Sequence, residues 1–171
     1  MADKQKTRRA FSLVELMMVM LIAAILGTIA MGTVSHTEAG LRAERAAREA
    51  VSAVRFARTR ALTDGTSYKV RFNVSARTIT VIDPANSNAI LSAPMAGGVM
   101  QINLSGRSDV SGVAMSPTIA GDTSDPYDVT FSALGGTSNS GTIAFTYGSI
   151  TKTLQIPNVG DPILVGDSRK P

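Results

Sequence analysis

The sequence predicts an α+β fold in which a long N-terminal helix packs against an antiparallel β-sheet. An apolar run without formal charge covers residues 16–37, and a segment rich in alanine and arginine follows over residues 38–64. From residue 66 onward, short segments alternate apolar with polar side chains. Long apolar or three-to-four-periodic stretches indicate helix, whereas a period of two indicates strands with one buried face. The 171 residues suffice for one such domain and one appended element.

The apolar run is long enough to cross a bilayer as a helix. About 20 consecutive uncharged residues, at 1.5 Å rise per residue, match the hydrocarbon thickness of a membrane. Residues 1–10 carry four basic side chains and one acidic one. Positive charge before a span favours a cytoplasmic N-terminus. We therefore expect residues 11–37 to form a transmembrane half-helix and the rest of the chain to lie outside the cytoplasm.

Glu15 is the only charged residue within residues 11–37. A carboxylate at the centre of a bilayer costs roughly 2.5 to 3.5 kcal/mol, and less near the interface. Two interpretations remain open. If the chain were cut between Ala10 and Phe11, the new α-ammonium, or that of a neighbouring subunit, would neutralise Glu15. Alternatively, Glu15 extends toward the headgroups at the cytoplasmic interface.

The residues around this carboxylate resemble the leader junction of type IV pilins and type II secretion pseudopilins; they read Arg8-Arg9-Ala10-Phe11-Ser12-Leu13-Val14-Glu15-Leu16. The resemblance implies a leader peptide of residues 1–10, cleaved by a prepilin peptidase between Ala10 and Phe11. It also implies N-methylation of Phe11 and a contact between Glu15 and the N-terminal amine of an adjacent subunit. Ala10 stands where this family nearly always has glycine.

Two other kinds of N-terminal segment compete with this interpretation. Residues 7–13 also resemble a twin-arginine export signal, but Glu15 would interrupt its apolar region. The apolar run is also longer than the 7 to 15 residues or so of a secretory signal. An uncleaved signal anchor is the third possibility. The mature N-terminus distinguishes them, because it would be Phe11, a residue beyond Ala30, or the start of the chain.

Residues 38–64 predict an amphipathic half-helix that continues the first. Its acidic and basic residues include two pairs four positions apart, Glu38/Arg42 and Glu44/Arg48, with the acid first as helices favour. Asp64-Gly65 predicts the helix end. We expect unpaired arginines to contact acidic faces of sister subunits rather than DNA. One apolar stripe is expected to cover the sheet: Leu41, Ala47, Val51, Val54, Ala57 and Ala61.

Residues 65–171 predict an extracytoplasmic domain of antiparallel β-sheet. A hairpin is expected around Ser75-Ala76-Arg77, with Tyr68, Val70, Phe72 and Val74 on one face. Residues 83–96 and 105–126 contain few large apolar side chains and predict surface loops. The expected strands are residues 68–74, 78–82, 99–104, 127–132, 142–147 and 150–156.

This body is similar to the GspH/FimT family of minor pseudopilins and minor pilins. The likeness rests on the helix end around Phe56 to Ala61, the turn from Phe131 to Gly135 and the strands around Phe145 and Leu154 to Gly160. It implies a low-abundance filament subunit that is not an enzyme. Its partners would be other pseudopilins or pilins, the prepilin peptidase, inner-membrane lipid before assembly and secreted cargo.

Catalytic and cofactor chemistry finds little support in the sequence. The chain has no cysteine and a single histidine, His36, which excludes thiolate sites and most histidine-based catalysis. Asp122, Asp125 and Asp128 recur every three residues, but this is not the spacing of a known calcium loop. We therefore predict no catalytic residue, no metal and no cofactor.

The charge distribution disfavours nucleic acid as a partner. The formal net charge is +4, yet residues 65–171 contain seven basic and seven acidic residues and are neutral overall. A basic patch would require Lys152, Arg169 and Lys170 to cluster. The predicted function is therefore a minor pseudopilin of a type II secretion system, a single-pass inner-membrane protein with a periplasmic domain. The alternative is a minor pilin of a type IV pilus acting in pilus biogenesis or DNA uptake.

Overall fold

The computed structural model of the protein describes residues 12–86, 89–92 and 99–169. One helix, α1 (Leu13–Asp64), is followed by nine strands, all in the second of two compact units, residues 1–37 and 38–171. The predicted cleavage site, Ala10 and Phe11, lies outside the described residues. The strands are β1 (Tyr68–Asn73), β2 (Thr78–Asp83), β3 (Ala89–Ile90), β4 (Gln101–Asn103), β5 (Ala114–Ile119), β6 (Tyr127–Phe131), β7 (Gly141–Tyr147), β8 (Ile150–Ile156) and β9 (Ile163–Arg169).

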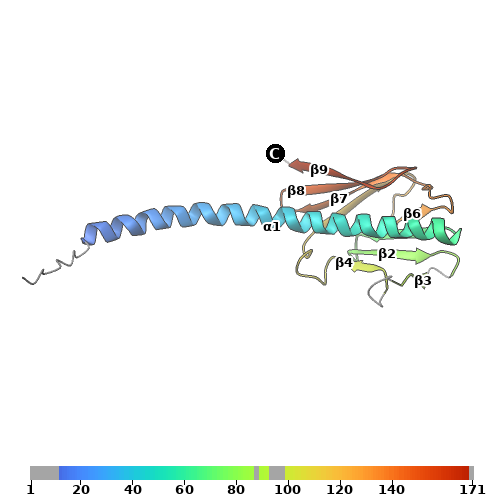
Figure 1. Ribbon diagram of the computed structural model, residues 1–171, viewed down its shortest axis with the longest axis horizontal. Helices are drawn as coiled ribbons and strands as arrows, with labels where there is room; N and C mark the ends of the chain where they lie inside the picture. Colours follow the sequence, from blue (N-terminus) through green and yellow to red (C-terminus); the bar gives the residue numbers. More distant parts are fainter. Residues whose placement is uncertain (1–11, 87–88, 93–98, 170–171) are drawn as a thin grey trace, which may run out of the picture. The chain divides into compact units, whose positions relative to one another are not determined.

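The strands form two antiparallel sheets. The five-stranded sheet has the order β3-β2-β1-β6, with β4 also paired to β2, and the four-stranded sheet has the order β5-β7-β8-β9. The part of α1 that belongs to this unit runs along both sheets, with β7, β8 and β9 on one side and β2, β3 and β4 on the other (Figure 1). The predicted α+β fold, a long helix packed on antiparallel sheet, is confirmed.

The β1–β2 hairpin forms as the alternation predicts. Val70 and Phe72 are fully buried, whereas Lys69 and Arg71 between them are only partly buried. The register pairs Phe72 with Ile79 across the hairpin. The period of two thus places one face of β1 in the core.

Two predicted surface loops contain strands. Residues 105–126 include β5, and residues 83–96 include the two-residue strand β3. β5 contains Pro117, which has no backbone N–H to donate. An edge strand tolerates proline because one of its two sides has no neighbouring strand, and β5 lies at the edge of its sheet. The buried side chains of β5, Met115 and Ile119, belong to the hydrophobic core. The strand pairs with β7, which lies later in the chain. The prediction of one sheet and of loops in these two segments was therefore wrong, and β9 lies beyond the last expected strand.

Alanine makes up most of the buried face of α1 over residues 38–64. Ala47, Val54, Ala57 and Ala61 are buried as predicted, but Leu41 is 47% exposed and Val51 is only partly buried. Small side chains let the helix approach the two sheets closely. The buried face of α1 therefore consists of smaller side chains than the predicted stripe, which included Leu41 and Val51. The other buried members are Ala43, Ala46, Ala50 and Ala53.

The C-terminal end of α1 is held by the turn after β6. The guanidinium Nε of Arg58 donates to the carbonyl oxygen of Gly135 at 3.0 Å, and Nη1 of Arg58 pairs with Asp161. Gly135 has φ +75°, and a Cβ placed there would lie 2.9 Å from Cδ2 of Leu62. Glycine is therefore favoured at position 135 for two reasons: it adopts the positive φ without strain, and it has no Cβ to collide with Leu62.

Candidate assembly surfaces

The first turn of α1 places Glu15 at the third helical position. The amide of Val14 donates to Oγ of Ser12 at 3.3 Å, and the amides of Glu15 and Leu16 donate to the carbonyl oxygen of Ser12 at 3.0 and 3.2 Å. Ser12 is thus the N-cap of α1. An acid near the helix N-terminus is favoured by the helix dipole. This role was not predicted, although Ser-x-x-Glu before an apolar run is a known helix-start signal.

The side chain of Glu15 is exposed and makes no ion pair within the described residues. Its carboxylate is therefore available to a group from another molecule. No comparison of this chain with another structure tests that contact, so the partner of Glu15 stays a prediction.

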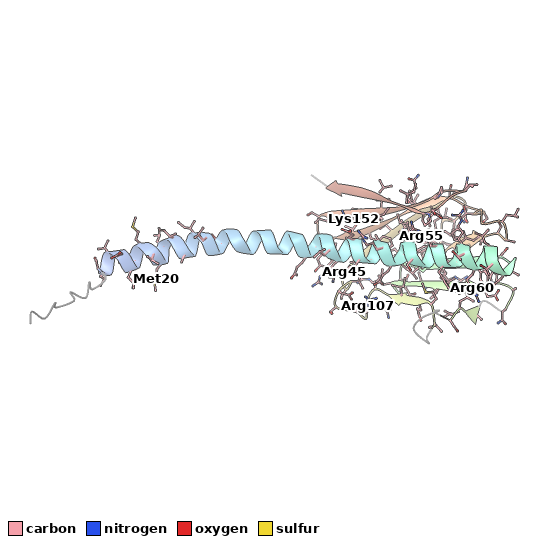
Figure 2. All side chains as sticks on the ribbon, viewed as in Figure 1. Met20, Arg45, Arg55, Arg60, Arg107 and Lys152 are labelled. Atoms are coloured by element: carbon pink, nitrogen blue, oxygen red, sulfur yellow. The ribbon has the colours of Figure 1, made fainter. Side chains whose placement is uncertain are left out.

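The first half of α1 exposes large apolar side chains around its whole circumference. Eleven residues between Leu13 and Leu26 have exposed fractions of 50 to 75%. A helix that is apolar on every side is stable in water only when other groups cover it. Met20 in Figure 2 is one of these exposed side chains. The full set is Leu13, Val14, Leu16, Met17, Met18, Val19, Met20, Leu21, Ile22, Ile25 and Leu26.

Among the residues that the structure describes, no helix has both the length and the hydropathy of a membrane span.

The outer face of α1 over residues 38–64 carries exposed arginines among hydroxyl, acidic and leucine side chains. Arg48 donates to Glu44 from Nε at 2.9 Å and from Nη2 at 2.6 Å, and Arg42 lies 4.0 Å from Glu38. Both predicted ion pairs are therefore confirmed. The hydrogen bond from Arg48, against a smaller opposing effect of burial, lowers the pKa of Glu44. The exposed positions follow a spacing of four and three residues: Leu41, Arg45, Arg48, Ser52, Arg55, Thr59 and Leu62.

The three aspartates of residues 122–128 hold loops and strands together rather than converging. Asp125 accepts hydrogen bonds from the amides of Val74 and Ser75 at 2.8 and 2.9 Å. Asp122 accepts one from the amide of Asp128 at 2.9 Å. Each carboxylate therefore has partners within the protein. Within the described part of the chain, no group of three or more acidic or histidine side chains could hold a metal ion.

Asp128 forms a charged cluster across β1 and β6. Arg71 donates to both of its carboxylate oxygens at 2.8 and 2.9 Å, and Nζ of Lys69 lies 3.2 Å away. Burial by itself would raise the pKa of Asp128, but the hydrogen bonds from Arg71 and Lys69 outweigh it, so the pKa lies below its usual range. Two basic side chains of the β-domain, Lys69 and Arg71, are therefore paired with Asp128.

A basic patch on the β-domain would require Lys152, Arg169 and Lys170 to cluster, and of these only the side chain of Lys152 is described. Lys152 in β8 lies next to α1, where its charge helps to lower the pKa of Glu44 (Figure 2). Arg169 is described only in its backbone, and Lys170 lies outside the described residues. The side chain of His36 is also outside them.

Comparison with known proteins agrees with this geometry. Residues 5–31 match the prokaryotic N-terminal methylation motif. No curated protein matches the sequence significantly. The fold is similar to that of the minor pseudopilin EpsH of the type 2 secretion system of Vibrio cholerae, with 14% identity and a TM-score of 0.55 over 72% of this chain and 96% of that one. A second crystal structure of that protein gives a TM-score of 0.54 at 14% identity over 76% and 97% of the two chains.

The type IV minor pilin FimU of Pseudomonas aeruginosa PAO1 has a similar fold as well, with 14% identity and a TM-score of 0.51 over 72% of this chain and 88% of that one. The chain has a pilin-like fold. The motif and the fold together confirm the resemblance predicted from the leader junction and the β-domain. Identities of this size show the fold alone.

Proposed function

We propose that the pilin-like protein is a minor pseudopilin, a structural subunit that helps to initiate or cap a short periplasmic filament of a type II secretion system. In this proposal it has no catalytic residue, no metal and no cofactor. It is stored in the inner membrane before assembly, with its N-terminus in the cytoplasm and its β-domain in the periplasm. Other pseudopilins, the prepilin peptidase and secreted cargo are its partners.

One observation carries the proposal most strongly: the exposed apolar half of α1 lies within the residues that match the methylation motif. Eleven large apolar side chains are half or more exposed between Leu13 and Leu26. Leaving a leucine-sized side chain in water rather than burying it is unfavourable by roughly 1.5 to 3 kcal/mol. Lipid can cover this surface before assembly, and the helices of neighbouring subunits can cover it afterwards. The transfer between these two environments is the assembly step.

The charged groups at the start of α1 set the register in this mechanism. Removal of residues 1–10 by the peptidase leaves the amine of Phe11, which is then methylated and stays positively charged. Glu15 of one subunit pairs with the amine of Phe11 on its neighbour. An unpaired carboxylate in an apolar environment is unfavourable by several kcal/mol, so subunits without this pair are disfavoured in the filament. Ser12 remains after cleavage and caps the helix that carries Glu15.

A second candidate is a minor pilin of a type IV pilus, and the likeness to the minor pilin FimU favours it. The two functions predict different losses when the gene is removed. Loss of extracellular enzymes with normal piliation supports the pseudopilin, whereas loss of pili or of DNA uptake with normal secretion supports the pilin.

The processing and register steps are tested on the full-length chain in its native cells. Mass spectrometry of the membrane-extracted protein should find a methylated N-terminus at Phe11; any other start contradicts the proposal. A Glu15→Leu variant should insert into the membrane normally and lose at least about tenfold in filament incorporation, the effect of about 1.4 kcal/mol. Glu15→Asp is the matched control, because it keeps the charge and should retain part of the incorporation.

A further inference from the structure

A shallow groove lies between α1 and the start of β9. It has a volume of about 490 Å³ and is lined by Arg48, Val51, Ser52, Arg55, Pro162 and Leu164. Val51 and Leu164 pack against the hydrophobic core and, with the buried Pro162, provide apolar surface. The groove thus combines an apolar floor with two guanidinium groups at its rim.

The positive charge of this groove is only partly neutralised within the chain. Arg48 binds Glu44 through Nε and Nη2 and has its other amino group left to donate. Arg55 is exposed and makes no ion pair within the described residues. Lys152 and Arg55 both lie on the side of α1 that is next to the four-stranded sheet (Figure 2). Within the described residues, Arg48 is therefore partly neutralised and Arg55 is not.

The spacing of the two arginines fits a helical occupant. Arg48 and Arg55 are seven residues apart, which is two helical turns and about 10 Å along the axis. Val51 lies between them, at the level of the apolar floor. A helix packed alongside would match them with carboxylates at positions i and i+7 and an apolar side chain at i+3 or i+4.

The carboxylates within residues 38–165 of a second copy are already engaged, and its Glu15, unpaired within the described residues, lies in the first half of α1, in the other compact unit. In the described part of the chain, seven carboxylates already form ion pairs. Asp83, Asp122 and Asp125 accept hydrogen bonds from backbone amides instead. Two copies that met through this face would set arginine against arginine, which is unfavourable.

We propose that this groove docks an acidic helix of a different filament subunit, with two carboxylates seven residues apart on either side of an apolar side chain. The proposal rests on the proposed function, because it requires that the chain assemble with other subunits. Arg55 is the principal contact, Arg48 shares its charge between Glu44 and the partner, and Val51, Pro162 and Leu164 receive the apolar side chain.

The test uses the full-length chain in native cells, with a thiol placed in the groove. The chain contains no cysteine, so Ser52→Cys provides a single site for a photoreactive maleimide. Illumination should give one main adduct, and mass spectrometry should map it to a helix of another subunit with the acidic pattern above. Filament incorporation of the same variant is measured in parallel by co-sedimentation.

Charge reversal then tests the contact itself. Adding Arg55→Glu to Ser52→Cys should reduce the adduct about fivefold or more, since an attractive pair becomes repulsive. Replacement of the facing partner carboxylate by lysine should restore it. Arg77→Glu is the matched control, because Arg77 is exposed in the β1–β2 turn and the change in net charge is the same. It should leave the adduct unchanged.

The outcomes separate this inference from the proposed function. Normal incorporation with no adduct at position 52 overturns the docking proposal and leaves the function standing. Three other results also overturn the docking proposal: an adduct with a second copy, an adduct on a segment without carboxylates, or equal adducts from the Arg55→Glu and Arg77→Glu variants. If the chain never enters a filament, both proposals fail.

Discussion

The two halves of α1 share one backbone element and differ in what covers them. Between Leu13 and Leu26 the large side chains are apolar on every side and at least half exposed. Between Ala43 and Ala61 the buried side chains are almost all alanine, and the exposed ones are mainly basic. The comparison teaches that helical structure alone says little about stability: the second half is stabilised by its own domain, whereas the first half must be covered by lipid or by other subunits.

The largest difference between the halves should follow from enlarging an alanine in each. Ala50 is fully buried, so Ala50→Leu should lower the free energy of unfolding of the β-domain by about 2 to 3 kcal/mol through overpacking. Ala24 is exposed, so Ala24→Leu should leave it unchanged. Urea unfolding of the detergent-solubilised chain measures both. Equal effects would contradict the contrast between the two halves.

The end of the second half should be sensitive to the turn that packs on it. Gly135→Ala should destabilise the domain by about 2 kcal/mol, because the positive φ penalises a side chain and its Cβ would displace Leu62. Gly148→Ala shares the positive φ, but a Cβ there meets nothing within 4 Å. The difference in thermal unfolding between the two variants isolates the contact with Leu62.

Acid should weaken the β-domain through Asp128 and spare the helical structure of the first half. The pKa of Asp128 is lower in the folded than in the unfolded chain, whose aspartates titrate near 3.9. Its stabilisation is therefore complete above about pH 4 and is lost as the pH falls through the folded pKa. Asp128→Asn should cost about 1.5 kcal/mol at pH 7 and flatten this dependence in unfolding measured between pH 2 and 7. An unchanged pH profile in the variant would exclude this role.

The smallest effect is expected on the outer face of α1. Arg48→Gln removes the exposed pair with Glu44 and should cost about 0.3 to 0.5 kcal/mol, with less at high salt. Arg55→Gln, which breaks no ion pair in the described residues, should cost less still. If both variants lowered stability by more than 1 kcal/mol, this face would belong to the fold rather than to a partner.

Local patterns in the sequence predicted most of the helix and the hairpin. Asp64-Gly65 ends α1 as expected, and Gly65 has φ +66°. Such features depend on neighbours along the chain, as do helix caps and the alternation in β1. The cap by Ser12 carried an equally local signal and could have been read in advance.

The remaining differences arise from contacts between distant residues. The alternation in a strand does not say which sheet it joins, so the division into two sheets and the pairing of β5 with β7 were not foreseen. The spacing of Asp122, Asp125 and Asp128 could not reveal that Asp128 faces Arg71, 57 positions away. The predicted stripe on α1 likewise did not include several of the alanines that are buried against the sheets.

The sequence by itself determined that a basic stretch is followed by an apolar segment bearing one carboxylate, that a long helix forms there and that strands complete the fold. These depend on composition and on short-range periodicity, which act within a few residues. Only the tertiary structure decided which face of α1 is buried, which carboxylates are neutralised and which arginines remain exposed. Those outcomes depend on how two sheets pack around one helix, and packing joins residues that the sequence separates.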